Sequence, residues 1–165
     1  MKHQVWLKLL VIVVGIVLLS ACAHAYAVEV GQSAPDFSLS SMGGQKTSMS
    51  DFKGKAIILN FFATWCPPCK GEIPDFVELQ KTYGDKGLTF IGVSLCNAQD
   101  TKTLADKLGI NYPVLIDDGK VSVAYGPVRS IPTTFVINKD GKVVNMYIGA
   151  RDRATFENDI KGLIK

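Results

Sequence analysis

Apolar positions fall into runs and alternations that predict the secondary structure along most of the chain. A nearly continuous apolar run at 55–62 is typical of a strand buried on both faces of a sheet. A second apolar run follows at 88–95, and helical spacing of apolar residues from 67 to 83 lies between the two. This order predicts a β-α-β unit with parallel strands and a right-handed connection.

Smaller elements are predicted around this unit. Weak alternation on both sides of Met42-Gly43-Gly44 predicts a β-hairpin near the start of the domain. The middle of the chain has helical composition at 100–108, a short extended piece at 112–116 and a brief helix within 120–125. We therefore expect an α/β fold, in which helices flank a central sheet.

The C-terminal third predicts a second hairpin and a closing helix. Alternating, β-rich runs at 133–137 and 142–148 are joined by a segment that contains Asp140-Gly141, a strong hairpin signal. The segment 152–164 is amphipathic and predicts a helix. Its core-facing side carries Phe156, Ile160, Leu163 and Ile164.

The residues before the domain have the pattern of an export signal. Lys2 and Lys8 precede an uncharged apolar run at 9–19, which is shorter than the roughly 18 residues of a transmembrane helix. Leu19-Ser20-Ala21-Cys22 resembles a lipobox, in which the Cys22 sulfur becomes lipidated, whereas A-x-A sites within 23–27 leave ordinary cleavage open. We expect a signal peptide at 1–21, a tether to the membrane at 22–32 and a domain at 33–165.

Composition and charge limit the possible partners. The chain has 165 residues, of which 47% are apolar and 20% charged, which suits one compact domain. Without Lys2 and Lys8, 16 basic residues face 15 acidic ones, and no long basic run exists. We therefore expect neither nucleic-acid binding nor a polybasic membrane patch, and we expect a monomer.

The candidate chemistry is carried by two cysteines between the first long strand and the helix after it. Cys66 and Cys69 form a C-x-x-C pair there. Unpaired N–H groups at the start of a helix stabilise a thiolate, so Cys66 is predicted to be the nucleophile. Cys69 lies one turn further in, where it is shielded and able to resolve a mixed disulfide.

A zinc site is the structural alternative for such a pair, because C-x-x-C supplies half of a tetrahedral site. The histidines are His3 and His24, which lie in the signal and the tether, and the domain holds no second C-x-x-C. We therefore expect no metal and no other cofactor. The same lack of histidine argues against a Cys-His hydrolase.

Three motifs in order give the chain a family resemblance over residues 31–165. They are GQSAPDFSL near the start, LNFFATWCPPCKGEIP around the cysteines and SIPTTFVINKDGKVV near the end. The chain resembles the thioredoxin superfamily, and within it the TlpA/ResA-like branch of extracytoplasmic thiol:disulfide oxidoreductases with an AhpC/TSA-Redoxin-like domain. The resemblance implies a thioredoxin-like fold, with a central mixed sheet and an N-terminal β-hairpin extension.

The resemblance also assigns substrate-binding residues. Pro132, after Ile131, would be a cis-proline that faces the two sulfurs and docks the substrate's extended chain. The alternative is an ordinary turn, since most X-Pro bonds are trans. Trp65 would flank the active site, where it could also serve as a packing residue. Pro74 matches the family's helix kink.

Proton transfer is assigned by the same resemblance to Glu72. Asn60 occupies the place where thioredoxins have a buried aspartate, so the chain departs from thioredoxin itself. In the TlpA/ResA branch a glutamate after the pair takes that role, and Glu72 lies three residues after Cys69 on the same helix face. The alternative is an exposed acid in an early helical turn.

The function implied is dithiol–disulfide exchange with exported proteins, in the periplasm or on the cell surface. The resemblance suggests reduction of apocytochrome c or similar thiol substrates, with electrons from a membrane thiol donor. Two other functions are considered. A thiol peroxidase needs a Pro-x-x-x-Thr-x-x-Cys loop, which this sequence lacks. A copper chaperone needs C-x-x-x-C and a distal histidine, whereas this domain has C-x-x-C and no histidine. Cys96, after the second long strand, is either an auxiliary redox thiol or a small hydrophobic residue.

Overall fold

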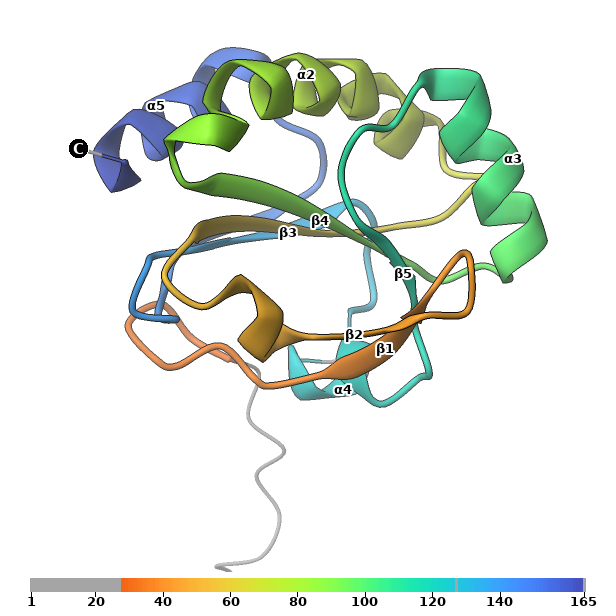
Figure 1. Cartoon of the computed structure of the whole chain (residues 1–165), viewed down its shortest axis with the longest axis horizontal. Coiled ribbons are helices and arrows are strands. Elements are labelled where there is room, and N and C mark those ends of the chain that lie inside the picture. The colour runs from red at the N-terminus through yellow and green to blue at the C-terminus, as the bar shows by residue number, and fades with distance from the viewer. Residues whose placement is uncertain (1–27, 127, 165) are drawn as a thin grey trace, which may run out of the picture.

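The protein has a single mixed sheet of seven strands, in the order β2-β1-β5-β4-β3-β6-β7. The computed structural model describes residues 28–126 and 128–164, so Cys22 and the predicted signal lie outside the described residues. Helices cover the sheet on both sides (Figure 1). The strands and helices form the thioredoxin-like α/β fold that the sequence predicted.

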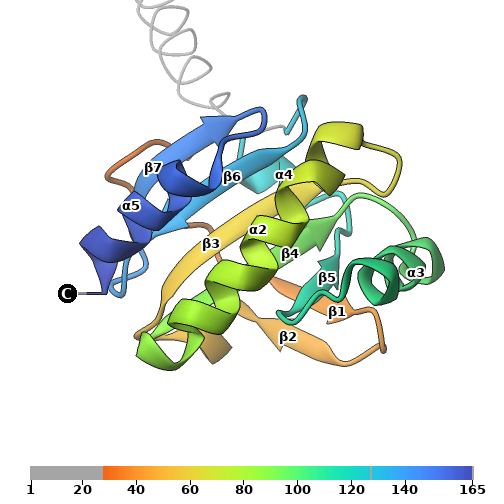
Figure 2. The same cartoon turned by 90° about the horizontal axis from the view of Figure 1, so that it is seen from above.

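The predicted β-α-β unit forms the middle of the sheet. β3 (Ala56–Phe62) and β4 (Leu88–Ser94) pair in parallel, and every residue of both strands is buried. α2 (Pro67–Tyr83) connects them and lies over one face of the sheet, roughly along β3 and β4 (Figure 2). Burial on both faces explains why the two apolar runs are nearly continuous rather than alternating.

Two antiparallel hairpins extend this unit on either side. β1 (Ser38–Ser41) pairs with β2 (Lys46–Ser48) at one edge of the sheet. β6 (Thr133–Ile137) pairs with β7 (Val143–Ile148) at the other edge. Both hairpins were expected from the sequence. Their attachment was not: β1 lies antiparallel to β5 (Val114–Ile116), while β6 lies antiparallel to β3.

Apolar side chains fill both faces of the sheet. One core lies between α2, α5 (Arg153–Leu163) and the sheet, where Phe156 and Ile160 are fully buried as the helical pattern predicted. The other core lies on the opposite face, which α4 (Val121–Ala124) covers. α3 (Ala98–Leu108) packs beside the end of β4 and its Leu104 is buried.

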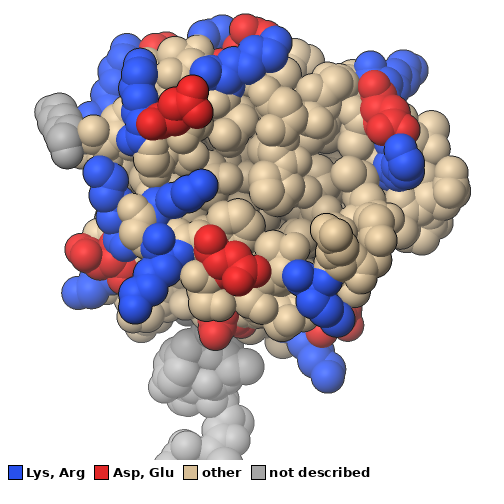
Figure 3. Space-filling view, in the orientation of Figure 1, with Lys and Arg blue, Asp and Glu red and all other residues tan. Residues whose placement is uncertain are grey.

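The described helices are all shorter or more polar than a bilayer-spanning segment. Within 28–126 and 128–164, none combines the length and the apolar content that a membrane crossing requires. Acidic and basic side chains lie next to one another around the rim of the face seen in Figure 3, and its middle carries no charge. Basic side chains gather along the left side of the view in Figure 3, with a few acidic ones among them.

Candidate active site

The cysteine pair lies at the junction between the end of β3 and the start of α2. Cys66 has extended backbone angles and is the N-cap of α2, and Pro67 occupies the first helical position, where a missing N–H costs nothing. Cys66 and Cys69 form a disulfide with an S–S distance of 2.06 Å. The Cys69 N–H donates to the Cys66 sulfur over 3.2 Å. This N–H would stabilise negative charge on the same sulfur after reduction.

Exposure differs strongly between the disulfide and the tryptophan before it. Cys66 is 3% exposed and Cys69 is 1% exposed. The sequence predicted that Cys69 is better shielded from solvent than Cys66, but in the oxidised protein the two differ little. Trp65 is 70% exposed. Trp65 therefore packs little against the core and leaves a large aromatic surface beside the sulfurs, as a substrate-binding residue would.

The loop before β6 closes over the disulfide from the other side. The peptide bond between Ile131 and Pro132 is cis, so the alternative of an ordinary trans turn does not apply. The carbonyl oxygen of Ile131 lies 3.8 Å from the Cys66 sulfur. The Gly149 N–H donates to the Pro132 carbonyl over 2.8 Å and holds this loop to the end of β7.

Glu72 is a buried carboxylate on the same face of α2 as Cys69. It is 4% exposed, which contradicts the alternative of an exposed acid in an early turn. Its Oε1 accepts the Arg151 N–H over 2.7 Å, whereas its buried Oε2 has no hydrogen-bond partner among the described residues. Burial raises the pKa of Glu72 to about 7, against opposing effects of the Arg151 N–H and guanidinium and with a small addition from Asp75.

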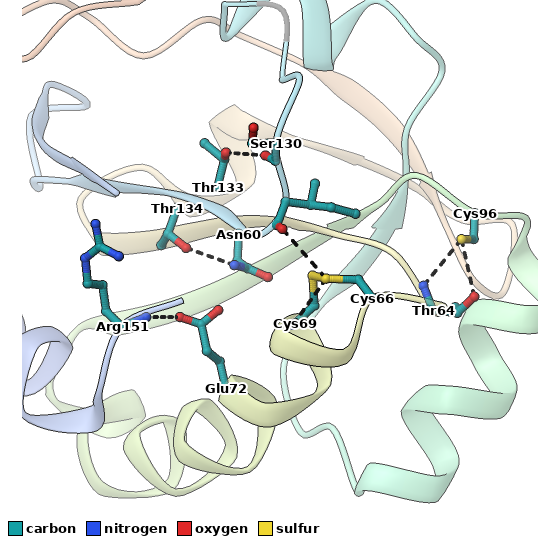
Figure 4. Close-up of a disulfide and its surroundings, with 11 residues drawn as sticks. Asn60, Thr64, Cys66, Cys69, Glu72, Cys96, Ser130, Thr133, Thr134 and Arg151 are labelled. Carbon is teal, nitrogen blue, oxygen red and sulfur yellow. Dashed lines mark hydrogen bonds between the residues drawn. A yellow bond between two sulfur atoms is a disulfide. The ribbon is translucent and has the colours of Figure 1, made fainter. Parts of the chain in front are cut away.

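Other polar groups surround this carboxylate. Asn60, which is buried in β3, donates to the Thr134 hydroxyl of β6 over 2.8 Å (Figure 4). Burial raises the pKa of the Tyr112 phenol beyond its usual range, and the negative charge of Glu72 adds to this. Of these two titratable groups, Glu72 is therefore the one whose pKa lies near neutral.

Cys96 lies on the opposite side of the disulfide from Glu72 (Figure 4). It is a free thiol, partly buried, and packs against the apolar cluster that contains the disulfide. Its sulfur accepts hydrogen bonds from the Thr64 N–H over 3.4 Å and the Thr64 hydroxyl over 3.3 Å. Cys96 is thus tied to the segment between β3 and α2.

The fold therefore brings most of the predicted residues to one edge of the sheet. Cys66 and Cys69 lie at the start of α2, and Trp65 lies in the turn directly before it. Ile131 and Pro132 come from the loop before β6. The hydrogen-bond partners of Glu72, Asn60 and Cys96 were not predicted from the sequence. These partners are the Arg151 N–H, Thr134 and Thr64.

No metal-binding cluster marks this edge among the described residues, and a hollow lies elsewhere. Among the described residues, no group of three or more His, Cys, Asp or Glu side chains could hold a metal ion. A hollow of about 550 Å³ lies at the opposite end of the sheet, between the segment before β3 and the turn after β6. The hollow contains no cysteine, so the reactive edge is identified by its chemistry rather than by cavity size.

Comparisons with known proteins agree with this geometry. A model of the AhpC/TSA family matches residues 30–146. Thioredoxin-like protein YneN of Bacillus subtilis is 36% identical over 137 residues, which cover 81% of this chain and 79% of YneN. Thiol-disulfide oxidoreductase ResA of Bacillus thuringiensis is 36% identical over 138 residues, with 81% and 78% covered. A crystal structure of a thiol:disulfide interchange protein of the thioredoxin family from Chlorobium tepidum has a TM-score of 0.76 at 37% identity and covers 87% of this chain and 100% of that one.

Proposed function

The chain belongs to the AhpC/TSA family and is a thiol-disulfide oxidoreductase, and we propose that Cys66 and Cys69 carry out its reaction on proteins outside the cytoplasm. The observation that carries this proposal is the disulfide at the start of α2, which faces the cis bond before Pro132. Its two sulfurs lie at a helix N-terminus, where a thiolate is favoured. The resulting chemistry needs no metal and no organic cofactor.

The reaction proceeds through a mixed disulfide. The thiolate of reduced Cys66 attacks one sulfur of a substrate disulfide, and the other substrate sulfur leaves as a thiolate. The Cys69 thiol then loses its proton and attacks the Cys66 sulfur, which releases the second substrate sulfur. The substrate gains two electrons, and Cys66 and Cys69 end in the disulfide that the structure holds.

Glu72 serves as the proton acceptor in the second step. Its carboxyl lies buried on the face of α2 that also carries Cys69, and one of its oxygens has no other partner among the described residues. A pKa of about 7 lets the carboxyl accept a proton and lose it again near neutral pH. Proton transfer from Cys69 to Glu72 then creates the attacking thiolate.

Trp65, Ile131 and Pro132 bind the substrate around these sulfurs. Trp65 offers an exposed aromatic surface, and the Ile131 carbonyl beside Cys66 can accept a hydrogen bond from an extended backbone. An extended segment bound there places its own sulfur close to Cys66. These three residues therefore favour polypeptide substrates over small thiols.

The location of the enzyme is proposed from the sequence before the described residues. The lipobox-like segment ending at Cys22 favours a lipid anchor on the outer side of a membrane, in the periplasm or on the cell surface. A membrane thiol donor would reduce the enzyme, which would reduce apocytochrome c or other exported proteins. Mass spectrometry of the membrane fraction tests the anchor: acylated Cys22 supports it, and a mature chain that begins after Cys22 contradicts it.

Trp65 provides a direct test of the proposed activity. It abuts Cys66 and is the only tryptophan besides Trp6, which lies in the predicted signal. In the mature protein its fluorescence should follow the redox state of the pair, with a two-electron midpoint in dithiothreitol or glutathione buffers. A Cys66→Ser variant is the control and should show no transition. The absence of both a midpoint and insulin reduction in the unaltered protein would contradict the proposal.

A further inference from the structure

β7 carries an apolar stripe that the described residues leave partly exposed. Val144 and Met146 are each 39% exposed and Ile148 is 57% exposed. Alternation along β7 places Met146 and Ile148 on one face, and Val144 follows them at the register shift between Asn145 and Val143. The residues between them face α5, where Tyr147 packs on the ring of Phe156 and donates to Asp159 over 2.8 Å. Single exposed apolar residues are common, but three along one strand form a continuous surface.

The outer edge of β7 is also open beside this stripe. β7 ends the strand order, with β6 on its inner side. On its outer side, Val143 exchanges backbone hydrogen bonds with Gly31 and Gln32, over 2.7 and 2.9 Å. Beyond Val143, no backbone segment within the described ranges pairs with this edge. An open strand edge is a template for an added strand.

Charge and proline do not protect the edge between 144 and 148, although the register shift between Val143 and Asn145 interrupts the regular strand at its far end. This segment contains no proline and no charged residue. The Asn145 side chain does accept the Met146 N–H over 2.9 Å, which screens one backbone donor. This hydrogen bond is local and exposed to solvent, so the backbone of an added strand can take the place of the Asn145 side chain.

The stripe begins at the reactive edge of the sheet. Ile148 pairs with Thr133, the residue directly after Pro132, and the next N–H along β7 donates to the Pro132 carbonyl. From Ile148 the strand leads away from the disulfide, and at about 3.3 Å per residue Val144 lies about 13 Å further along. An extended segment whose sulfur reacts at Cys66 is therefore long enough to reach the stripe within a few residues.

We propose that Val144, Met146 and Ile148 form a docking strip for an extended, apolar segment of the polypeptide substrate, which adds to the open edge of β7. This inference rests on the proposed function, because it extends the surface at which the substrate reacts. A second copy of the chain fits less well, since three side chains on one short edge fall far below the roughly 800 Å² per partner of a stable interface. A small contact suits a substrate that must be released after each reaction.

Two synthetic peptides test the strip. Each has one cysteine in a disulfide with a chromogenic thiol, and its arms carry Val and Ile at alternating positions, or Ser and Asn at the same positions. The Cys66 thiolate attacks the peptide sulfur, the chromogenic thiolate leaves with the electrons of the broken bond, and Cys69 then frees the peptide as a thiol. We expect the apolar peptide to react about tenfold faster than the polar one, which corresponds to the burial of part of two apolar side chains.

Variants on the two edges of the sheet locate the effect. Met146→Lys should remove the tenfold preference and leave the rates with the polar peptide and with the symmetric disulfide of the chromogenic thiol unchanged. Thr47→Lys puts the same charge on β2, the opposite edge strand, and should keep the preference. If Met146→Lys does not fold, Val144→Lys, further from the disulfide, takes its place with the same expectation.

The outcomes separate this inference from the proposed function. Equal rates with both peptides in the unaltered protein would overturn the docking strip and leave the oxidoreductase intact. Persistence of the preference in both Met146→Lys and Val144→Lys would also overturn it. A dimer in sedimentation that Met146→Lys dissociates would assign the strip to a second copy instead. No reaction with any of the three disulfides would contradict the proposed function itself.

Discussion

Two polar groups flank the disulfide, and the fold treats them in opposite ways (Figure 4). On one side, Glu72 is buried with one oxygen that has no partner among the described residues, and its pKa is raised to about 7. On the other side, the Cys96 sulfur accepts two hydrogen bonds from Thr64 and completes the packing of an apolar cluster. A buried carboxyl without full pairing costs stability, whereas a packed thiol does not.

The difference in burial and pairing between Glu72 and Cys96 indicates which of them can take part in the reaction of Cys66 and Cys69. Desolvation is the physical cause of the raised pKa of Glu72, and a carboxyl with such a pKa suits the proposed acceptance of a proton from Cys69. Cys96 has the location of a redox thiol, but its contacts are those of a structural residue. The comparison favours Glu72 as a participant in the reaction and Cys96 as a support for the segment between β3 and α2.

The largest effects are expected at the pair itself, which lies between the two flanking groups. Cys66→Ser should abolish exchange, because no other described thiol sits at the helix N-terminus. Cys69→Ser should still attack a substrate but fail to resolve it, so that a mixed disulfide accumulates. Mass spectrometry under non-reducing conditions detects this adduct. An adduct on Cys96 in the Cys66→Ser variant would break the comparison, since it would make Cys96 a nucleophile.

Glu72→Gln is expected to give the next largest effect. Loss of the proton acceptor should slow the resolving step by about 100-fold near pH 7, the scale of general acid–base catalysis. The rate should also lose its change near pH 7, where Glu72 titrates. Stopped-flow Trp65 fluorescence across a pH series measures both.

Glu78→Gln is the matched control for this prediction. Glu78 is an acid on the same helix, but it is exposed and paired with Lys81 over 2.8 Å. Its replacement should leave the rate and the pH profile unchanged. An unchanged pH profile in Glu72→Gln would leave the proton transfer to another group and remove the distinction between the two sides of the disulfide.

The cost of burying Glu72 should also appear in protein stability. The carboxyl has a pKa of about 7 in the folded protein and an ordinary value of 4.5. The folded state therefore binds a proton more tightly than the unfolded state, and stability falls as pH rises from 4.5 to 7. A shift of this size corresponds to about 3 kcal/mol.

Chemical denaturation at several pH values measures this cost. The free energy of unfolding of the unaltered protein should fall between pH 4.5 and 7 relative to that of Glu72→Gln, in which position 72 does not titrate. The gap between the two proteins should widen with pH up to 7 and then stay constant. Parallel curves across this range would show that Glu72 carries no buried charge.

The local pattern of the sequence predicted the strand and the helix that hold Cys66 and Cys69. It did not predict the hydrogen bonds of Glu72 and Cys96 beside them. The apolar run at 55–62 and the prolines after Cys66 were enough to place a buried strand and a helix start, with the C-x-x-C pair between them. The family resemblance added the cis bond before Pro132 and the interest in Glu72. Each of these features is visible within a few residues of sequence.

The contacts that distinguish the two sides depend on tertiary structure. The Arg151 N–H that bonds Glu72 comes from a residue 79 positions away, and backbone donors have no signature in the sequence. Thr64 and Cys96 are 32 positions apart. The attachment of β1 to β5 belongs to the same class, because short polar strands carry little information about their partners.

The smallest effect is expected for Cys96→Ala. The variant loses two long hydrogen bonds to sulfur, but Thr64 is only partly buried, so water can replace them. The free energy of unfolding should fall by about 1 kcal/mol, and the redox midpoint of the pair should stay the same. Redox titration of Trp65 fluorescence gives the midpoint. A shift of about 30 mV in the midpoint corresponds to about 1.4 kcal/mol for two electrons. Such a shift would show that Cys96 interacts differently with the dithiol and with the disulfide. Cys96 would then take part in the reaction, as is proposed for Glu72.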